Sequence, residues 1–188
     1  RLPPETVNRI AAGEVVERPA AALKELVENA IDAGAGSFAI RLPAGGLDLI
    51  EVTDDGCGMT PEEIALALER HATSKLPDED LESVSTLGFR GEALPSIASV
   101  SRLLLETRHE SRESGTSVEI NGARLAGVKE IARSRGTTLT VRDLFFNVPA
   151  RKKFLRADST ELGHIVNFVT QYALAHPEGR FVLRSAGS

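Results

Sequence analysis

The sequence has very little cysteine: Cys57 is the only one in 188 residues, so no disulfide can form within the chain. A chain of this length buries roughly 70% of its unfolded surface, and it folds without such cross-links. It lacks an apolar run near the roughly 20 residues that span a bilayer. Its first residues, Arg1-Leu2-Pro3-Pro4-Glu5, lack the apolar core of a signal peptide. We therefore expect a soluble globular domain in a reducing cytoplasm.

Several common functional motifs are also missing. There is no G-x-x-x-x-G-K-[ST] phosphate loop, and Gly56-Cys57-Gly58 lacks the third glycine of the dinucleotide-binding pattern. One cysteine and four scattered histidines give no zinc-binding spacing, and there is no G-x-S-x-G nucleophile elbow. The net charge of −5 argues against a stand-alone nucleic-acid-binding module. Any chemistry must therefore use a less common set of residues.

The pattern of apolar residues predicts an α+β fold. Helices are expected over 21–33, from the capping-box sequence at 60–63 to about Arg70, and over 158–175 with Asp158 as N-cap. Strands are expected over 37–42, 47–53, 101–107, 116–121, 123–131, 137–143 and 180–184, with Asn121-Gly122 as a hairpin turn. Since the strands come in hairpin-like groups, we expect a two-layer sandwich. It should be a mixed, mostly antiparallel sheet with helices on one face.

The first predicted helix carries a polar face opposite its apolar stripe. Glu25, Asn29 and Asp32 fall within a narrow sector of this helix. A solvated helix face, which is the more common case, explains the pattern. A catalytic face also explains it, because a carboxylate can deprotonate a water and an amide oxygen suits a Mg²⁺ ion already bound to phosphate. The spacing alone does not choose between them.

Three glycine-bearing segments follow. Asp54 ends a predicted strand, where it is either part of an Asp-Gly turn or an acceptor for an exocyclic amine beside glycines that let a flat ligand approach. The segment 88–95 places glycines before a helix that begins near Gly91 or Glu92, which is either a plain junction or an anion site to which Lys75 adds charge. Gly136-Thr137 begins a late strand and means little by itself.

Together these four pieces resemble the GHKL ATPase superfamily, which has E-x-x-x-N on a helix, D-x-G-x-G after a strand, a glycine-bearing lid and a late G-T. Three longer strings resemble its DNA mismatch-repair branch, the MutL family: IAAGEVVERP at 10–19, KELVEN at 24–29 and GFRGEAL at 88–94. The strings HATSK at 71–75 and NVPARKKF at 147–154 fit the same family. Pro95 departs from it, since a small residue is expected there.

The resemblance implies a role for each motif. Glu25 would be the general base for the attacking water, and Asn29 would hold Mg²⁺ between the phosphates. Asp54 would accept a hydrogen bond from the adenine amine, with Gly58 and Thr137 completing the base pocket. The ATP lid, about 71–94, would supply Thr73, Ser74, Lys75, Arg90, Gly91, Glu92, Ala93 and Leu94. No catalytic role falls to Glu28 and Asp32, which we expect to repel each other at i,i+4.

The resemblance also implies a function. It is Mg²⁺-dependent binding and slow hydrolysis of ATP, which drives N-terminal homodimerisation as a conformational switch in DNA mismatch repair. The expected partners are ATP, the mismatch-recognition protein MutS and DNA, in a nucleoid-associated cytoplasmic setting without a membrane. Two alternatives remain: an ATP-gated binding module in which hydrolysis is dispensable, and a topoisomerase- or chaperone-type GHKL protein.

The family architecture sets two further expectations. Residues 1–188 correspond to the nucleotide-binding half, without the second, transducer subdomain or the C-terminal dimerisation region. This length alone should therefore bind ATP weakly and hydrolyse it slowly or not at all. A local basic cluster, formed by Arg151, Lys152, Lys153 and Arg156, is either a solvated helix start or a contact for DNA phosphates.

Overall fold

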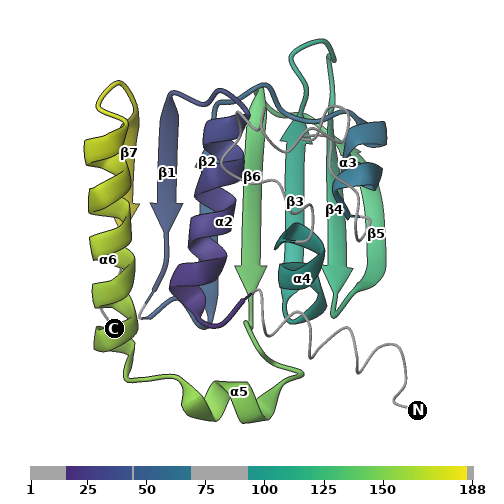
Figure 1. The fold of residues 1–188 in the computed structure, drawn as a ribbon. Helices are drawn as coiled ribbons and strands as arrows, with labels where there is room; N and C mark the ends of the chain where they lie inside the picture. The colour runs from purple at the N-terminus through teal and green to yellow at the C-terminus, as the bar shows by residue number, and fades with distance from the viewer. Residues whose placement is uncertain (1–15, 44, 69–92, 186–188) are drawn as a thin grey trace, which may run out of the picture.

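The structure is a computed structural model, and it describes residues 16–43, 45–68 and 93–185. Within these residues, a seven-stranded sheet has the order β5-β4-β3-β6-β2-β1-β7 (Figure 1). The strands are β1 Ser37–Arg41, β2 Leu49–Asp54, β3 Arg102–Arg108, β4 Gly115–Asn121, β5 Arg124–Ile131, β6 Gly136–Arg142 and β7 Arg180–Arg184. All neighbouring pairs are antiparallel except β1 and β7. The predicted mixed, mostly antiparallel sheet is confirmed.

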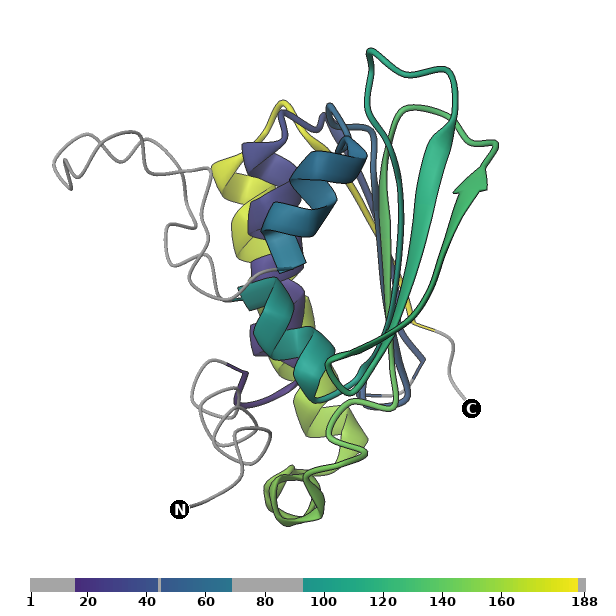
Figure 2. The same cartoon turned by 90° about the vertical axis from the view of Figure 1, so that its right-hand side faces the viewer.

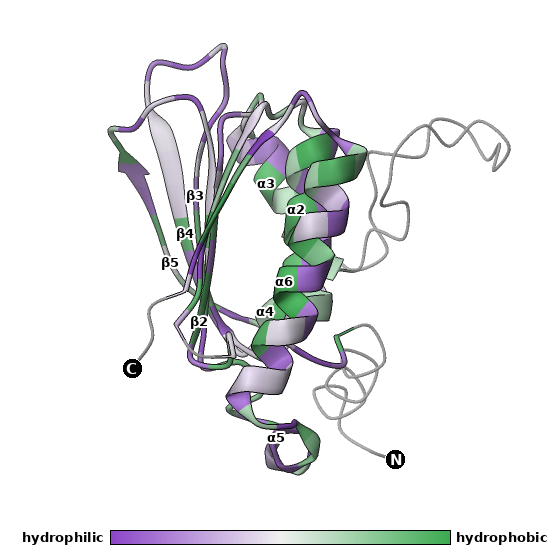
Figure 3. Ribbon diagram, turned by 90° about the vertical axis from the view of Figure 1, so that its left-hand side faces the viewer, coloured by the Kyte–Doolittle hydropathy of each residue, from purple (hydrophilic) through white to green (hydrophobic). Residues whose placement is uncertain are grey.

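The helices are α2 Pro19–Asp32, α3 Pro61–Leu68, α4 Ala93–Ser99, α5 Pro149–Phe154 and α6 Asp158–Ala175. Figures 2 and 3 show α2, α3, α4 and α6 together on one face of the sheet, while α5 lies beyond its end. The predicted two-layer arrangement is therefore confirmed. Of the helices in the described ranges, none combines the length and the apolar character that crossing a membrane requires.

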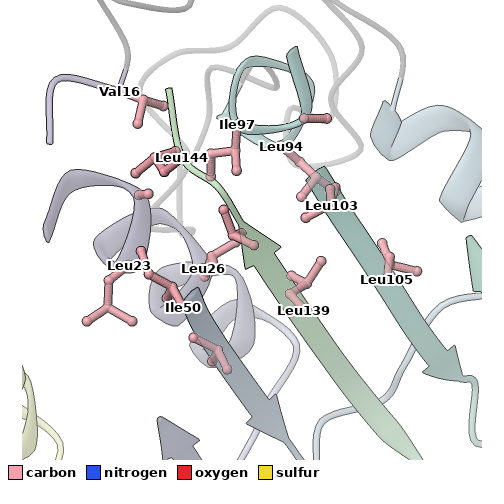
Figure 4. Packing of buried hydrophobic residues seen from close by; sticks show 14 of the residues in the cluster. Val16, Leu23, Leu26, Ile50, Leu94, Ile97, Leu103, Leu105, Leu139 and Leu144 are labelled. Atoms are coloured by element: carbon pink, nitrogen blue, oxygen red, sulfur yellow. The ribbon is translucent and has the colours of Figure 1, made fainter. Parts of the chain in front are cut away.

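The core lies between the helix layer and the sheet (Figure 4). In β2, Ile50 and Val52 are buried toward the helices, whereas Glu51 and Thr53 face the other way, as the period of two requires. On α2, Leu23 and Leu26 are buried against this face of the sheet. A fully buried side chain of this size contributes about 1.5 to 3 kcal/mol. The apolar stripe predicted for 21–33 is thus the surface that fixes α2 to the sheet.

Two local predictions were wrong by one residue. The N-cap of α6 is Ala157 rather than Asp158, and no side chain caps this helix. Glu161 instead reaches back and accepts the backbone N–H of Arg156. By contrast, the capping box at the start of α3 is confirmed, since the side chains and backbone N–H groups of Thr60 and Glu63 bond reciprocally.

The β4–β5 hairpin turns on Gly122 and Ala123 rather than on Asn121-Gly122. Asn121 pairs with Arg124 across the ladder, and the two residues between them have φ of +57° and +70°. These angles fit a two-residue turn in which both central residues are left-handed. Ala123 therefore occupies a conformation that costs an alanine more than a glycine.

We predict that Ala123→Gly stabilises the protein by about 0.5 to 1 kcal/mol, because glycine adopts the left-handed conformation without a Cβ clash. Urea unfolding measures the change. The matched control is Ala39→Gly in the middle of β1, which should destabilise by about 0.5 to 1 kcal/mol. Equal effects of the two substitutions would contradict the prediction.

Candidate functional site

The C-terminal end of α2 is fixed to the loop that follows β2. Gly34, with φ of +72°, ends the helix, and the N–H of Ala35 bonds to the carbonyl of Ala30 in a Schellman motif. The carbonyl of Ala33 then accepts the N–H of Cys57 at 3.0 Å. This bond joins α2, which carries Glu25 and Asn29, to the loop that follows Asp54.

The polar face of α2 is only partly exposed. Glu25 and Asn29 are both half-buried, and they lie one turn apart on the same side of the helix. The carboxylate and the amide therefore belong to a face of α2 that is neither packed into the core nor fully exposed to solvent.

Asp54 is the buried acidic residue at this end of the sheet. It is the last residue of β2, with 8% of its surface exposed, and its Oδ1 accepts the N–H of Gly56 at 2.9 Å. Burial raises the pKa of this carboxyl, and the backbone N–H groups of Gly56 and Thr137 and the charge of Arg133 act against that rise. A carboxylate has about four acceptor positions. Asp54 therefore keeps acceptor capacity for a ligand.

Asp55 has a different task from its neighbour. Its Oδ1 accepts the N–H groups of Gly36 and Ser37 at 2.8 and 2.9 Å, which joins the loop to the start of β1. Burial acts to raise the pKa of this carboxyl, but the N–H groups of Ser37, Gly36 and Asp55 itself, together with the charge of Arg135, outweigh it and the pKa is lowered. Asp55 thus holds the loop in place, whereas Asp54 is buried at the end of β2, opposite Thr137 of β6.

A network of hydroxyl groups adjoins Asp54. Thr107 of β3 is fully buried, and its Oγ1 lies 2.9 Å from that of Thr137. The same oxygen accepts the N–H of Met59 at 3.0 Å and lies 3.2 Å from the carbonyl of Gly136. Thr137 was predicted as a site residue, whereas Thr107 was not, because the alternation of β3 was the one signal in the sequence that pointed to it.

The glycines of the site are needed by the protein backbone itself. Gly58 has φ of +72°, and a Cβ there would lie 2.0 Å from the carbonyl oxygen of Arg108. Gly136 has φ of +110°, and a Cβ there would lie 2.1 Å from the carbonyl oxygen of Asp54. Both glycines allow neighbouring segments to approach closely, in addition to any approach by a ligand.

Glu28 of α2 has partners that were not predicted from the sequence. The expected repulsion between Glu28 and Asp32 stays a prediction. The side chain of Glu28 is buried and accepts a hydrogen bond from the hydroxyl of Tyr172 on α6. Its Oε1 also lies 3.7 Å from Nζ of Lys24. The spacing of Lys24 and Glu28 at i,i+4 signalled the ion pair, but no local signal pointed to a tyrosine so far along the chain.

Most lid residues lie outside the described residues: Thr73, Ser74, Lys75, Arg90, Gly91 and Glu92. Ala93 and Leu94 begin α4, and the side chain of Leu94 is buried in the core. Pro95 is the third residue of this helix, where a missing N–H costs no intrahelical bond. Leu94 can therefore reach a ligand only through its backbone.

Among the residues described, no three His, Cys, Asp or Glu side chains lie together as metal ligands. An ion held entirely by such side chains is therefore not indicated there. Asn29 offers a single neutral oxygen, which fits a Mg²⁺ ion whose other ligands are phosphate oxygens and water.

Comparison with known proteins matches residues 17–140 to the model of the histidine kinase-, DNA gyrase B- and HSP90-like ATPase family. The chain is 59% identical over 183 residues to the DNA mismatch repair protein MutL of Solibacter usitatus, covering 97% of the chain and 28% of the relative. It is 60% identical over 187 residues to MutL of Anaeromyxobacter dehalogenans, covering 99% and 31%. The chain thus spans less than a third of the length of these relatives.

Among solved structures, the chain is similar to the Aquifex aeolicus MutL ATPase domain complexed with ADP. The TM-score is 0.77 and the identity 34%, covering 92% of this chain and 62% of that one. It is also similar to the N-terminal domain of a DNA repair protein, with a TM-score of 0.82 and 30% identity, covering 96% and 52%.

We predict that Thr107→Val destabilises the protein by about 1 to 3 kcal/mol, because it removes the buried acceptor of the Met59 N–H and the partner of Thr137. Chemical denaturation measures the loss. As a control, Thr53→Val removes a part-buried hydroxyl that pairs with Thr138 on the other face of the sheet. This control should cost less than about 0.5 kcal/mol, because β-branched valine suits a strand.

Proposed function

Because this chain belongs to the histidine kinase-, DNA gyrase B- and HSP90-like ATPase family, we propose that it binds Mg²⁺-ATP and hydrolyses it slowly. The observation that carries the proposal is the buried carboxylate of Asp54, which retains acceptor capacity and is joined through Cys57 and Ala33 to the helix that bears Glu25 and Asn29.

The base selectivity follows from the chemistry of Asp54. An ionised carboxylate only accepts hydrogen bonds, so it pairs with the exocyclic amine of adenine and repels the carbonyl that guanine has at the same position. Thr137 lies beside it, across the β2–β6 ladder, and Gly58 lets the following loop close against β3. These three residues form the proposed base pocket.

The proposed hydrolytic group is Glu25, which would orient and deprotonate the attacking water. Asn29, one turn along α2, would supply an amide oxygen to Mg²⁺. When bound, the ion neutralises charge on the phosphate oxygens. The lid residues Thr73, Ser74, Lys75, Arg90 and Gly91 to Leu94 would contact the phosphates, an assignment that rests on the sequence resemblance.

The biological role we propose is in DNA mismatch repair, since the similar full-length proteins carry that name. ATP, bound in part by the lid, would drive N-terminal homodimerisation, so that the chain acts as a switch. The proposed partners are MutS and DNA, and the proposed location is the nucleoid-associated cytoplasm. An alternative is an ATP-gated binding module in which the bound nucleotide, rather than its hydrolysis, carries the signal.

We predict that Glu25→Ala lowers ATP turnover by at least about 100-fold, because it removes the general base, while Mg²⁺-ATP binding persists. Asn29→Ala should abolish Mg²⁺-ATP binding. Calorimetry with Mg²⁺-ATP and Mg²⁺-GTP, and phosphate release, measure both in the longest natural form of the protein that contains this sequence. GTP is the matched control for base selectivity.

Unchanged turnover in Glu25→Ala would contradict the assignment of the base. Equal binding of ATP and GTP would contradict the role of Asp54. If Glu25→Ala loses turnover but retains repair activity, the alternative of an ATP-gated module is favoured.

A second candidate function is suggested by α5. This short helix carries Arg151, Lys152 and Lys153, and Phe154 beside them is 88% exposed. Cations next to an exposed aromatic ring are the usual elements of a nucleic-acid contact, since the cations meet phosphates and the ring can stack on a base. A solvated helix explains the charged side chains, but it does not explain why the ring of Phe154 is exposed to solvent.

We predict that single-stranded DNA binds weakly through α5 and that the affinity falls at least tenfold from about 50 to 200 mM salt. The variant Lys152→Ala/Lys153→Ala should weaken binding and reduce the magnitude of the log–log salt slope by roughly 1.4. Fluorescence anisotropy measures it, with Lys129→Ala on the edge strand β5 as the control. Binding that does not depend on salt would exclude this contact.

A further inference from the structure

A buried carboxylate on α2 is held by a tyrosine of the neighbouring helix. Glu28 is 6% exposed, and its Oε1 accepts a hydrogen bond from the hydroxyl of Tyr172 on α6. The same oxygen lies 3.7 Å from Nζ of Lys24, one turn earlier on α2, whose side chain is half exposed. The tyrosine is therefore the donor that reaches Glu28 from outside its own helix.

The contact lies beside the proposed catalytic face. At about 100° per residue, Glu28 is roughly 60° to one side of Glu25, and Asn29 is roughly 40° to the other. The charge of Glu25 is close enough to act on the same tyrosine. The pKa of Tyr172 is raised above its usual value, first by burial, then by its bond to Glu28, and further by Glu25.

The ring of Tyr172 is anchored independently of its hydroxyl. It lies 4.4 Å from the ring of Phe168, centroid to centroid, and packs against the core. Figure 1 shows α6 alongside α2 in the helix layer. α2 is therefore held in two directions: Leu23 and Leu26 pack it against the sheet, and Tyr172 bonds it to the neighbouring helix α6. Removing the hydroxyl would leave a buried carboxylate whose remaining partner among the described residues is the half-exposed Lys24, which costs more than the bond itself contributes.

We propose that Tyr172 and Glu28 form a clamp that fixes the rotation of α2 about its axis and so holds Glu25, the proposed base, in its working position. Tyr172 is then a positioning residue, acting through Glu28 rather than on the substrate. This inference rests on the proposed ATPase function. A small rotation of α2 would displace the proposed base more than the bound nucleotide, because the base must meet a single water while the nucleotide has many contacts.

The first test is Tyr172→Phe in the longest natural form of the protein. It retains the ring and its packing and removes only the donor. We expect kcat to fall about 10-fold, with KM and the Kd of Mg²⁺-ATP changed less than about 2-fold, because the lost interaction affects the catalytic step and not nucleotide binding. Thr170→Val is the matched control, since it removes an exposed hydroxyl that bonds to Val166 on the same helix, and it should leave kcat unchanged.

A double-mutant cycle separates the clamp from a general loss of structure. Glu28→Gln keeps an acceptor for the tyrosine and should retain kcat within about 3-fold. Glu28→Leu removes the acceptor and should match Tyr172→Phe. The combination of Glu28→Leu with Tyr172→Phe should cost no more than the larger single effect, because both remove the same interaction.

Three outcomes would overturn the clamp. The first is a normal kcat in Tyr172→Phe while Glu25→Ala is inactive, which leaves the proposed function standing. The second is a loss of Mg²⁺-ATP binding in proportion to the loss of kcat, which indicates a contact that supports the whole site rather than the position of the base. The third is unchanged turnover in Glu25→Ala, which removes the proposed ATPase mechanism and the clamp with it.

Discussion

The register of three central strands determines the candidate site. Asp54 of β2 lies opposite Thr137 of β6, and Thr137 lies opposite Thr107 of β3. One alignment therefore brings a carboxylate and two hydroxyls to the same end of the sheet, all on the face that the helices cover. A slip of one residue would turn each of these side chains to the other face. The apolar residues of the same strands prevent such a slip, because Ile50, Val52 and Leu139 would leave the core with them.

The helix layer completes the site through backbone contacts. The carbonyl of Ala33 holds the N–H of Cys57, and Asp55 holds the N–H groups at the start of β1. Such contacts require close approach of main chains, which explains the glycine at position 56, where a Cβ would lie 2.9 Å from the carbonyl oxygen of Ala33. Because these bonds lie within the protein, the position of α2 relative to Asp54 is set before any nucleotide arrives. Preorganised polar groups of this kind need little rearrangement on binding.

The sequence predicted the parts of the structure whose signals are local. Helical spacing located α2 and α6, alternation located the strands, and the Thr60–Glu63 capping box marked the start of α3. The contacts that it did not predict join residues far apart, such as Thr107 with Thr137, 30 positions on, and Glu28 with Tyr172, 144 positions on. The N-cap of α6 was misplaced for another reason. The spacing rule pairs Asp158 with Glu161 three residues on, but the side chain of Glu161 accepts the N–H of Arg156, and the helix begins one residue earlier than the rule predicts, with Ala157 as its N-cap.

The acidic residues show why composition alone said little about function. Asp55 is exposed and its oxygen is bound by two backbone N–H groups, while Glu28 is buried and bound by a tyrosine and a lysine. Asp54 is also buried, yet burial dominates over its donors and raises its pKa. Asp54 has lost its contacts with water, and the protein's own donors replace them only in part. A further hydrogen-bond donor therefore stabilises such a carboxylate more than an exposed one, because the low local dielectric strengthens the bond. Of these three carboxylates, Asp54 is therefore the one whose environment favours a ligand, and the others are used in holding α2 and the loop around it.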